Sequence, residues 1–335
     1  MIALVMNTAP LSAENNHDTA LDPERYRKIE ALNKDSFYLN EPQVFRVVTS
    51  IAGRETRLNP VDTYAGNMSE AWGRKYLPDH ERIENARDNI DAFLRQDGIE
   101  VDPANVRILF PQRQYNISLK VIDIDSYPVD PTDTAARSAE ERGDMLVTKN
   151  PNIILAVRPA DCPVILAYGI NEQGERVDML AHIAHEGARA HFVDQFMQNT
   201  KALEIIPESL RVYITPGAQA ENYNYTKDVN PLDNTEGLEK LYVNIHKTQK
   251  DNGETVFAYQ IDTPNFVYEE LRRLGLDTYQ LFLDTSDTAA PNSQYASHGR
   301  SARSQREWEA NGSHYNQDYE INKRDLIVAI PQGNS

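Results

Sequence analysis

The sequence predicts an α+β fold, a single domain in which mixed β-sheets are sandwiched by helices. Two observations support this prediction. Short apolar runs rich in β-branched residues recur along the chain, and over residues 152–197 they give way to apolar residues at helical spacing. Of the 335 residues, 40% are hydrophobic and 25% are charged, which is typical of globular proteins.

Residues 1–40 mix Asn, Asp, Glu and Lys with few apolar anchors, which predicts an N-terminal arm with partial order. Within this arm, Asp22-Pro23-Glu24 predicts the start of a short helix that runs through Leu32. The single domain then covers residues 41–335.

Alternating or continuous apolar runs predict strands, and helical spacing with capping signals predicts helices. The predicted strands are 43–51, 106–110, 119–124, 153–157, 164–166, 177–183, 210–214, 255–260, 279–283 and 326–330. The predicted helices are 79–96, 191–203 and 263–274, the last with Thr263 as N-cap and Pro264 as its first residue. Residues 222–237 are polar, and we expect them to form a loop.

Charge and cysteine content limit the compartment and the partners. The formal charge of −17 lacks the basic footprint that nucleic acid or an anionic membrane would need. No apolar run approaches the length of a membrane-spanning helix, and the opening MIALVM is too short for a signal segment. A single cysteine excludes an intrachain disulfide and fits a reducing compartment. We therefore expect a cytoplasmic protein whose partner is a small molecule, not nucleic acid or a membrane.

The only cysteine, Cys162, and His185 define the candidate site. Cys162 precedes the predicted strand 164–166, and His185 follows the predicted strand 177–183. If these strands lie near each other in one sheet, the thiol and the imidazole meet at the strand ends. Such a pair suits metal binding or nucleophilic catalysis. A lone cysteine is more often an inert part of the core, so that alternative stays open.

Two further histidines lie near this pair. His182 would face the opposite side of the sheet from His185 in a regular strand, which favours a structural, hydrogen-bonded role. His191 begins the predicted helix 191–203, where a surface position is expected.

Five segments, taken in order, resemble the motifs of one known family. They are Gly66-Asn67-Met68-Ser69, Glu84-Asn85-Ala86-Arg87, Gly143-Asp144-Met145-Leu146-Val147-Thr148, Pro159-Ala160-Asp161-Cys162-Pro163-Val164-Ile165-Leu166 and His185-Glu186-Gly187-Ala188-Arg189-Ala190. This set resembles the laccase-domain family, also described as multicopper polyphenol oxidases, purine nucleoside phosphorylases or peptidoglycan editing factors. The resemblance implies an α/β/β/α arrangement, shared with the cytotoxic necrotizing factor-like fold. By comparison with the family, this chain carries insertions near 127–141 and 301–319.

The resemblance also implies three catalytic and three substrate-binding residues. They are Cys162, His185 and Arg189, followed by Gln114, Asn67 and Arg300. Cys162 and His185 would bind zinc or copper, or handle a proton at the base, and Arg189 would contact phosphate. Gln114 stands where the family has another site histidine, and an amide is a poor zinc or copper ligand, so this metal set is incomplete.

The activity implied by the resemblance is phosphorolysis of purine nucleosides, with some adenosine deamination. Two alternatives remain open: a metal-free cysteine hydrolase or deamidase in which His185 activates Cys162, and a catalytically degenerate binding protein, because Gln114 replaces the histidine. Multicopper oxidation would need a dense set of histidines and cysteines. One cysteine and eight scattered histidines do not supply that set.

Overall fold

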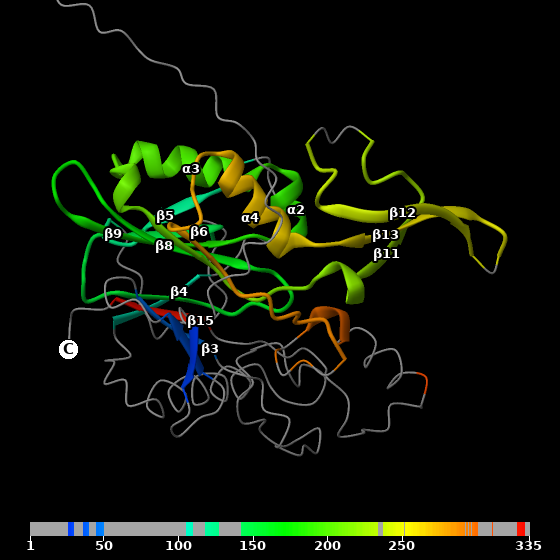
Figure 1. The fold of residues 1–335 in the computed structure, drawn as a ribbon, viewed down its shortest axis with the longest axis horizontal. Coiled ribbons are helices and arrows are strands. Elements are labelled where there is room, and N and C mark those ends of the chain that lie inside the picture. The colour runs from blue at the N-terminus through cyan, green and yellow to red at the C-terminus, as the bar shows by residue number, and fades with distance from the viewer. Residues whose placement is uncertain are drawn as a thin grey trace, which may run out of the picture.

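Two β-sheets lie face to face in the computed structural model, and helices cover the outer face of the larger sheet (Figure 1). In spatial order, the six-stranded sheet consists of β14 (Leu281–Leu283), β10 (Arg211–Ile214), β8 (Val164–Ile170), β9 (Arg176–His182), β6 (Met145–Thr148) and β5 (Val121–Asp123). The four-stranded sheet consists of β3 (Phe45–Thr49), β15 (Ile327–Pro331), β7 (Ile154–Val157) and β4 (Val106–Leu109).

Two smaller sheets complete the strands that the structure describes. A three-stranded sheet of β11 (Asn224–Lys227), β13 (Thr255–Ile261) and β12 (Tyr242–Gln249) projects from one end of the molecule (Figure 1). Strands β1 (Tyr26–Ile29) and β2 (Ser36–Leu39) pair antiparallel with each other. Together with the helices, these sheets confirm the predicted α+β class.

The structure describes residues 26–29, 36–39, 45–49, 105–109, 118–126, 142–233, 237–250, 252–291, 293, 295, 297–300, 310 and 327–331. The predicted helix 79–96, the site candidates Asn67 and Gln114, the insertion at 127–141 and nearly all of the insertion at 301–319 lie outside these residues.

Strand β8 shows how the sequence builds two apolar layers. Ile165 and Ala167 belong to the core cluster under the helices, whereas Val164, Leu166 and Tyr168 belong to the cluster between the two sheets. Successive side chains of a strand point to opposite faces, so a strand covered on both sides needs an unbroken apolar run. This explains why the central strands had the clearest signal in the sequence.

The helices place apolar faces on the six-stranded sheet. They are α2 (His185–Arg189), α3 (Phe192–Ala202) and α4 (Thr263–Arg273), and short 3-10 turns occupy Pro207–Ser209 and Ala220–Asn222. Phe192, Phe196 and Phe266 are buried in the cluster beneath them. Among the described helices, none combines the length and the apolar character needed to cross a bilayer.

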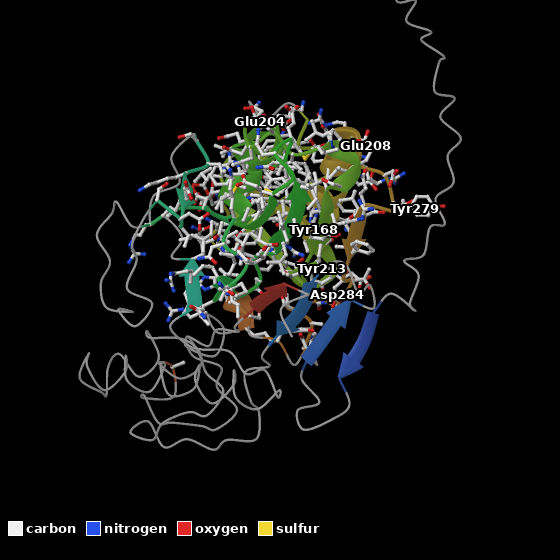
Figure 2. All side chains as sticks on the ribbon, turned by 90° about the vertical axis from the view of Figure 1, so that its left-hand side faces the viewer. Tyr168, Glu204, Glu208, Tyr213, Tyr279 and Asp284 are labelled. Carbon is white, nitrogen blue, oxygen red and sulfur yellow. The ribbon has the colours of Figure 1, made fainter. Side chains whose placement is uncertain are left out.

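The packed interior and its edge can be followed in Figure 2. Tyr168 and Tyr213 lie within the described core, and the Tyr213 hydroxyl is 3.5 Å from Asp284 Oδ2. Tyr279 projects from the periphery as one of the exposed large side chains.

Three expectations about individual elements were wrong. The predicted helix through Leu32 is replaced by strand β1, whose backbone pairs with β2. Part of the predicted loop 222–237 forms β11, a short edge strand. Strands β2, β6 and β12 and helix α2 were not predicted. The N-cap of α4 is Asp262, not Thr263, because the Asp262 carboxylate accepts the backbone N–H of Asn265. The predicted strands are all present, with ends shifted by a few residues.

Candidate functional site

Strands β8 and β9 bring the two central candidate residues to the same edge of the six-stranded sheet. The strands pair antiparallel, with Val164 opposite His182. Just beyond this pair, the backbone N–H of Ile183 donates to the Pro163 carbonyl at 3.0 Å. Only Pro163 separates Cys162 from β8, and only Ile183 and Ala184 separate β9 from His185, the first residue of α2. The predicted adjacency of these strand ends is therefore confirmed.

The imidazole of His185 has a different partner on each ring nitrogen. Nε2 is 2.8 Å from the hydroxyl of Tyr242, which lies on β12. Nδ1 is 3.6 Å from Oε1 of Glu186. The side chain is only 14% exposed, so the ring is held between these groups within the protein.

Burial lowers the pKa of His185 from 6.5 to about 4. The neighbouring Glu186 carboxylate raises this pKa, while Arg189 and Lys227 lower it. The loss of hydration is the largest of these effects, because burial disfavours the charged imidazolium. At neutral pH the ring is therefore neutral, with one N–H donor and one lone pair.

Two tyrosines contact this histidine and two more pack against them, and together they form what we call the tyrosine cluster: Tyr223, Tyr225, Tyr242 and Tyr259. The ring of Tyr242 meets His185 edge-on at 5.6 Å, and the ring of Tyr225 lies 6.1 Å away, tilted by 30°. Tyr225 stacks on Tyr259 at 6.0 Å and meets Tyr223 edge-on at 4.9 Å. The three-stranded sheet thus supplies one aromatic wall beside the site.

The same cluster extends to the cysteine. Burial raises the pKa of Tyr223 and Tyr225 above the ordinary value, and the nearby Asp161 and Cys162 add to this effect. Burial likewise raises the pKa of Tyr242. The hydroxyls of these three tyrosines therefore keep their hydrogens at neutral pH and can donate hydrogen bonds.

Asp161, next to the cysteine, is buried and has a left-handed backbone with φ of 66°. Its Oδ1 accepts from Thr288 Oγ1 at 2.9 Å, and its Oδ2 accepts from Ser297 Oγ at 2.9 Å and from the Gly299 N–H at 2.8 Å. Burial raises the pKa of this carboxyl, while the three donors and Arg300 oppose the rise. These hydrogen bonds therefore tie Asp161, the residue before Cys162, to residues 288–299.

The two candidate arginines lie in different surroundings. The Arg189 side chain is 34% exposed on α2, 3.5 Å from Glu186 Oε2, and its charge acts on His185 and Tyr242. Arg300 is buried, and its guanidinium donates to the carbonyls of Thr288, Ala290 and Tyr295. Arg189 thus borders the site, whereas Arg300 holds the loop that anchors Asp161.

The remaining histidine candidates lie apart from this arrangement. His182 is buried at the end of β9, and His191 is exposed at the start of α3, with Nδ1 3.8 Å from Asp194. The sequence analysis missed the tyrosine cluster and Glu186. A signal for part of the cluster was present, because Tyr223 and Tyr225 alternate with asparagines at the two-residue period of a strand.

Within the described part of the chain, no group of three or more His, Cys, Asp or Glu side chains could hold a metal ion. Cys162 and His185 offer two donors, and a catalytic zinc takes three from the protein. The described residues therefore do not form a complete metal site.

The fold is similar to that of three solved structures. Hypothetical protein YfiH of Bacillus licheniformis is 15% identical, with a TM-score of 0.57 over 92% of this chain and 99% of that chain. YlmD of Geobacillus stearothermophilus is 13% identical, with a TM-score of 0.59 over 93% and 100%. Protein NMB0706 of Neisseria meningitidis is 16% identical, with a TM-score of 0.52 over 87% and 96%. At these identities the similarity establishes the fold alone.

Sequence comparison establishes the family. A comparison with curated proteins finds no match to this chain. The family model described as multi-copper polyphenol oxidoreductase laccase matches residues 102–309, which is more than half of the chain and includes Cys162, His185 and Arg189. The resemblance seen in the sequence motifs is thereby confirmed, and the chain belongs to the multi-copper polyphenol oxidoreductase laccase family.

Proposed function

We propose that this protein is an enzyme that cleaves purine nucleosides with phosphate, at a site formed by Cys162, His185 and Arg189. One observation carries the proposal: a neutral imidazole contacts two tyrosine rings, and the partly exposed guanidinium of Arg189 is near enough to act on it. The tyrosine rings would stack on a flat purine base, the imidazole would serve the departing nitrogen, and the guanidinium would bind the anionic phosphate.

The aromatic wall supports binding of the base. Each stacked base contributes about 1–3 kcal/mol on an aromatic side chain, with little dependence on its identity. The Tyr225 ring lies 6.1 Å from the His185 ring, and Cys162 is near enough to act on the Tyr225 hydroxyl electrostatically, so a base on this tyrosine would lie near both residues. The guanidinium of Arg189 supplies a planar pair of donors for phosphate oxygens.

The reaction forms a bond between a phosphate oxygen and C1′ of the ribose and breaks the bond between C1′ and N9 of the base. The bonding electron pair leaves with the purine, which takes up one proton that dihydrogen phosphate supplies. His185 and Cys162 are the titratable groups proposed to pass that proton, and Arg189 orients the attacking oxygen. Because the described residues do not complete a metal site, no step uses a metal.

The proposal is tested by incubating the purified protein with inosine or adenosine, with and without phosphate, and separating the products by chromatography. Phosphate-dependent release of the base is expected, and Cys162→Ala should abolish it. Arg189→Gln should raise KM for phosphate by about tenfold or more, because a charge-assisted hydrogen bond is lost. The control Arg272→Gln removes the same charge from a surface position on α4 and should leave KM unchanged.

Other outcomes point to different functions. Formation of inosine from adenosine without phosphate would assign deamination to the site. If neither nucleoside reacts, the phosphorolysis proposal is refuted. Rapid alkylation of Cys162 at pH values below the ordinary thiol pKa of about 8.5 would then favour the cysteine hydrolase.

A further inference from the structure

The face of the three-stranded sheet that carries the tyrosine cluster continues past the cluster to an exposed row of residues. On β11, Lys227 lies two positions after Tyr225 and therefore points to the same face. Lys227 pairs across the sheet with Phe257 on β13, and Phe257 pairs with Lys247 on β12. Directly paired residues share a face, so an aromatic ring lies between two lysines. We call Lys227, Phe257 and Lys247 the lysine row.

The lysine row lies beside the candidate site. The Nζ atom of Lys247 is 5.6 Å from the centroid of the Phe257 ring, which confirms that its ammonium is on the same face. The charge of Lys227 acts on His185, so this lysine lies near the imidazole. In Figure 1 the sheet extends outward from α2, the helix that begins with His185. Both lysines are exposed and Phe257 is half-buried, so a ligand can reach the row from solvent.

The charges of the two lysines are available to a ligand. Within the part of the chain that the structure describes, Lys227 and Lys247 form no ion pair, whereas Lys250, just after β12, contacts Asp228 and Glu254 at 3.6 and 3.0 Å. Because the chain has a formal charge of −17, two such cations beside an aromatic ring are a local exception on an acidic molecule. A local positive field of this kind raises the concentration of an anion at the surface.

A nucleoside with a phosphate group fits an aromatic surface that has cations at its outer end. An ammonium binds phosphate as a point charge, and a flat base stacks on a tyrosine ring. Tyr225 and Lys227 are two strand positions apart, a separation of about 7 Å that is comparable with the span of one ribose unit. A base stacked on Tyr225 therefore leaves its ribose within reach of Lys227.

We propose that Lys227 and Lys247 bind a phosphate group at the outer end of the nucleoside site. The phosphate is carried by the nucleoside as its 5′-monoester or is the free anion, and the two sources share this chemistry. The placement of the base on Tyr225 rests on the proposed function, whereas binding of the phosphate requires no turnover. The lysine row is distinct from Arg189, which lies on α2.

The test is calorimetric titration of the full chain with inosine, inosine 5′-monophosphate and inorganic phosphate. At about 0.01 M ionic strength, where the Debye length is about 30 Å, the monophosphate should bind about tenfold tighter than inosine. The variant Lys227→Gln/Lys247→Gln should lose this advantage and keep the wild-type affinity for inosine. The matched control Lys201→Gln/Lys240→Gln removes two exposed lysines from other elements and should keep the advantage. At about 1 M ionic strength, screening should remove the advantage from the wild type.

The two sources of phosphate give different results. If the monophosphate has no advantage but inorganic phosphate binds about tenfold weaker to the lysine variant, the bound group is the free anion. Equal affinity of the wild type and the lysine variant for both phosphate ligands would overturn the proposal. Lysine-dependent binding without base release refutes phosphorolysis alone, and base release with no dependence of binding on the lysines refutes the phosphate site alone.

Discussion

The buried neutral imidazole of His185 should make the free energy of unfolding depend on pH in acid solution. The unfolded chain binds a proton at this residue near the ordinary pKa of 6.5, whereas the folded protein binds it only near 4. As the pH falls through this interval, the unfolded state gains a proton that the folded state does not, so stability is lost on acidification. Above the unfolded pKa this penalty vanishes.

The size of the effect follows from the two pKa values. Each pH unit between the two pKa values costs about 1.4 kcal/mol of stability. At about pH 4.5, which is still above the folded pKa, the accumulated loss is about 2.5 kcal/mol. The side chain is 14% exposed, so screening by solvent should reduce this value little. The perturbation is His185→Gln, which removes the titration and keeps a side chain that can hydrogen bond to Tyr242.

The assay is urea unfolding of wild type and His185→Gln at about pH 7.5 and about pH 4.5, where other acidic groups contribute nearly equally to both proteins. Relative to the variant, the wild type should lose about 2.5 kcal/mol between the two conditions. A relative change near zero, or a relative gain by the wild type in acid, would refute the idea that His185 is buried in its neutral form.

Three further changes test the surroundings of the site by unfolding or proteolysis. Asp161→Ala leaves two buried donors and one part-buried donor without their acceptor and should cost about 3 kcal/mol or more in urea unfolding; a loss below about 1 kcal/mol would contradict this. In Gly187→Ala, the new Cβ would lie 2.6 Å from Cδ2 of Phe192. This overpacking should cost about 1–3 kcal/mol, and Phe192→Leu should recover part of it in thermal unfolding. Arg300→Met removes the donors to three carbonyls, so cleavage within residues 288–300 by a protease should accelerate at unchanged far-ultraviolet circular dichroism.

The elements predicted well from sequence are those with one strong local pattern. β8 and β9 are buried almost throughout, and α3 and α4 carry regular apolar faces. β11 has a mostly exposed, polar sequence, and β12 alternates irregularly because its register shifts between Val243 and His246. These strands are stabilised by pairing with β13, which a local pattern does not reveal.

The site divides in the same way. The strand ends next to Cys162 and His185 could be placed together from sequence, because β8 and β9 adjoin through a short turn. The contact between His185 and Tyr242 joins residues that are 57 positions apart, and the one between Asp161 and Gly299 spans 138 positions. Distant contacts of this kind depend on how the sheets pack, so the chemical surroundings of the histidine became visible only in three dimensions.

The place of β15 in the four-stranded sheet has a consequence for how the chain is made. This strand lies between β3 and β7, with Ile327 opposite both Thr49 and Val157. During synthesis β3 and β7 leave the ribosome long before the strand that lies between them exists, so β3 has nothing in this sheet to pair with until residues 327–331 emerge. Two facing strand edges must therefore wait, exposed to chaperones or to other nascent chains, until the last described segment closes the gap.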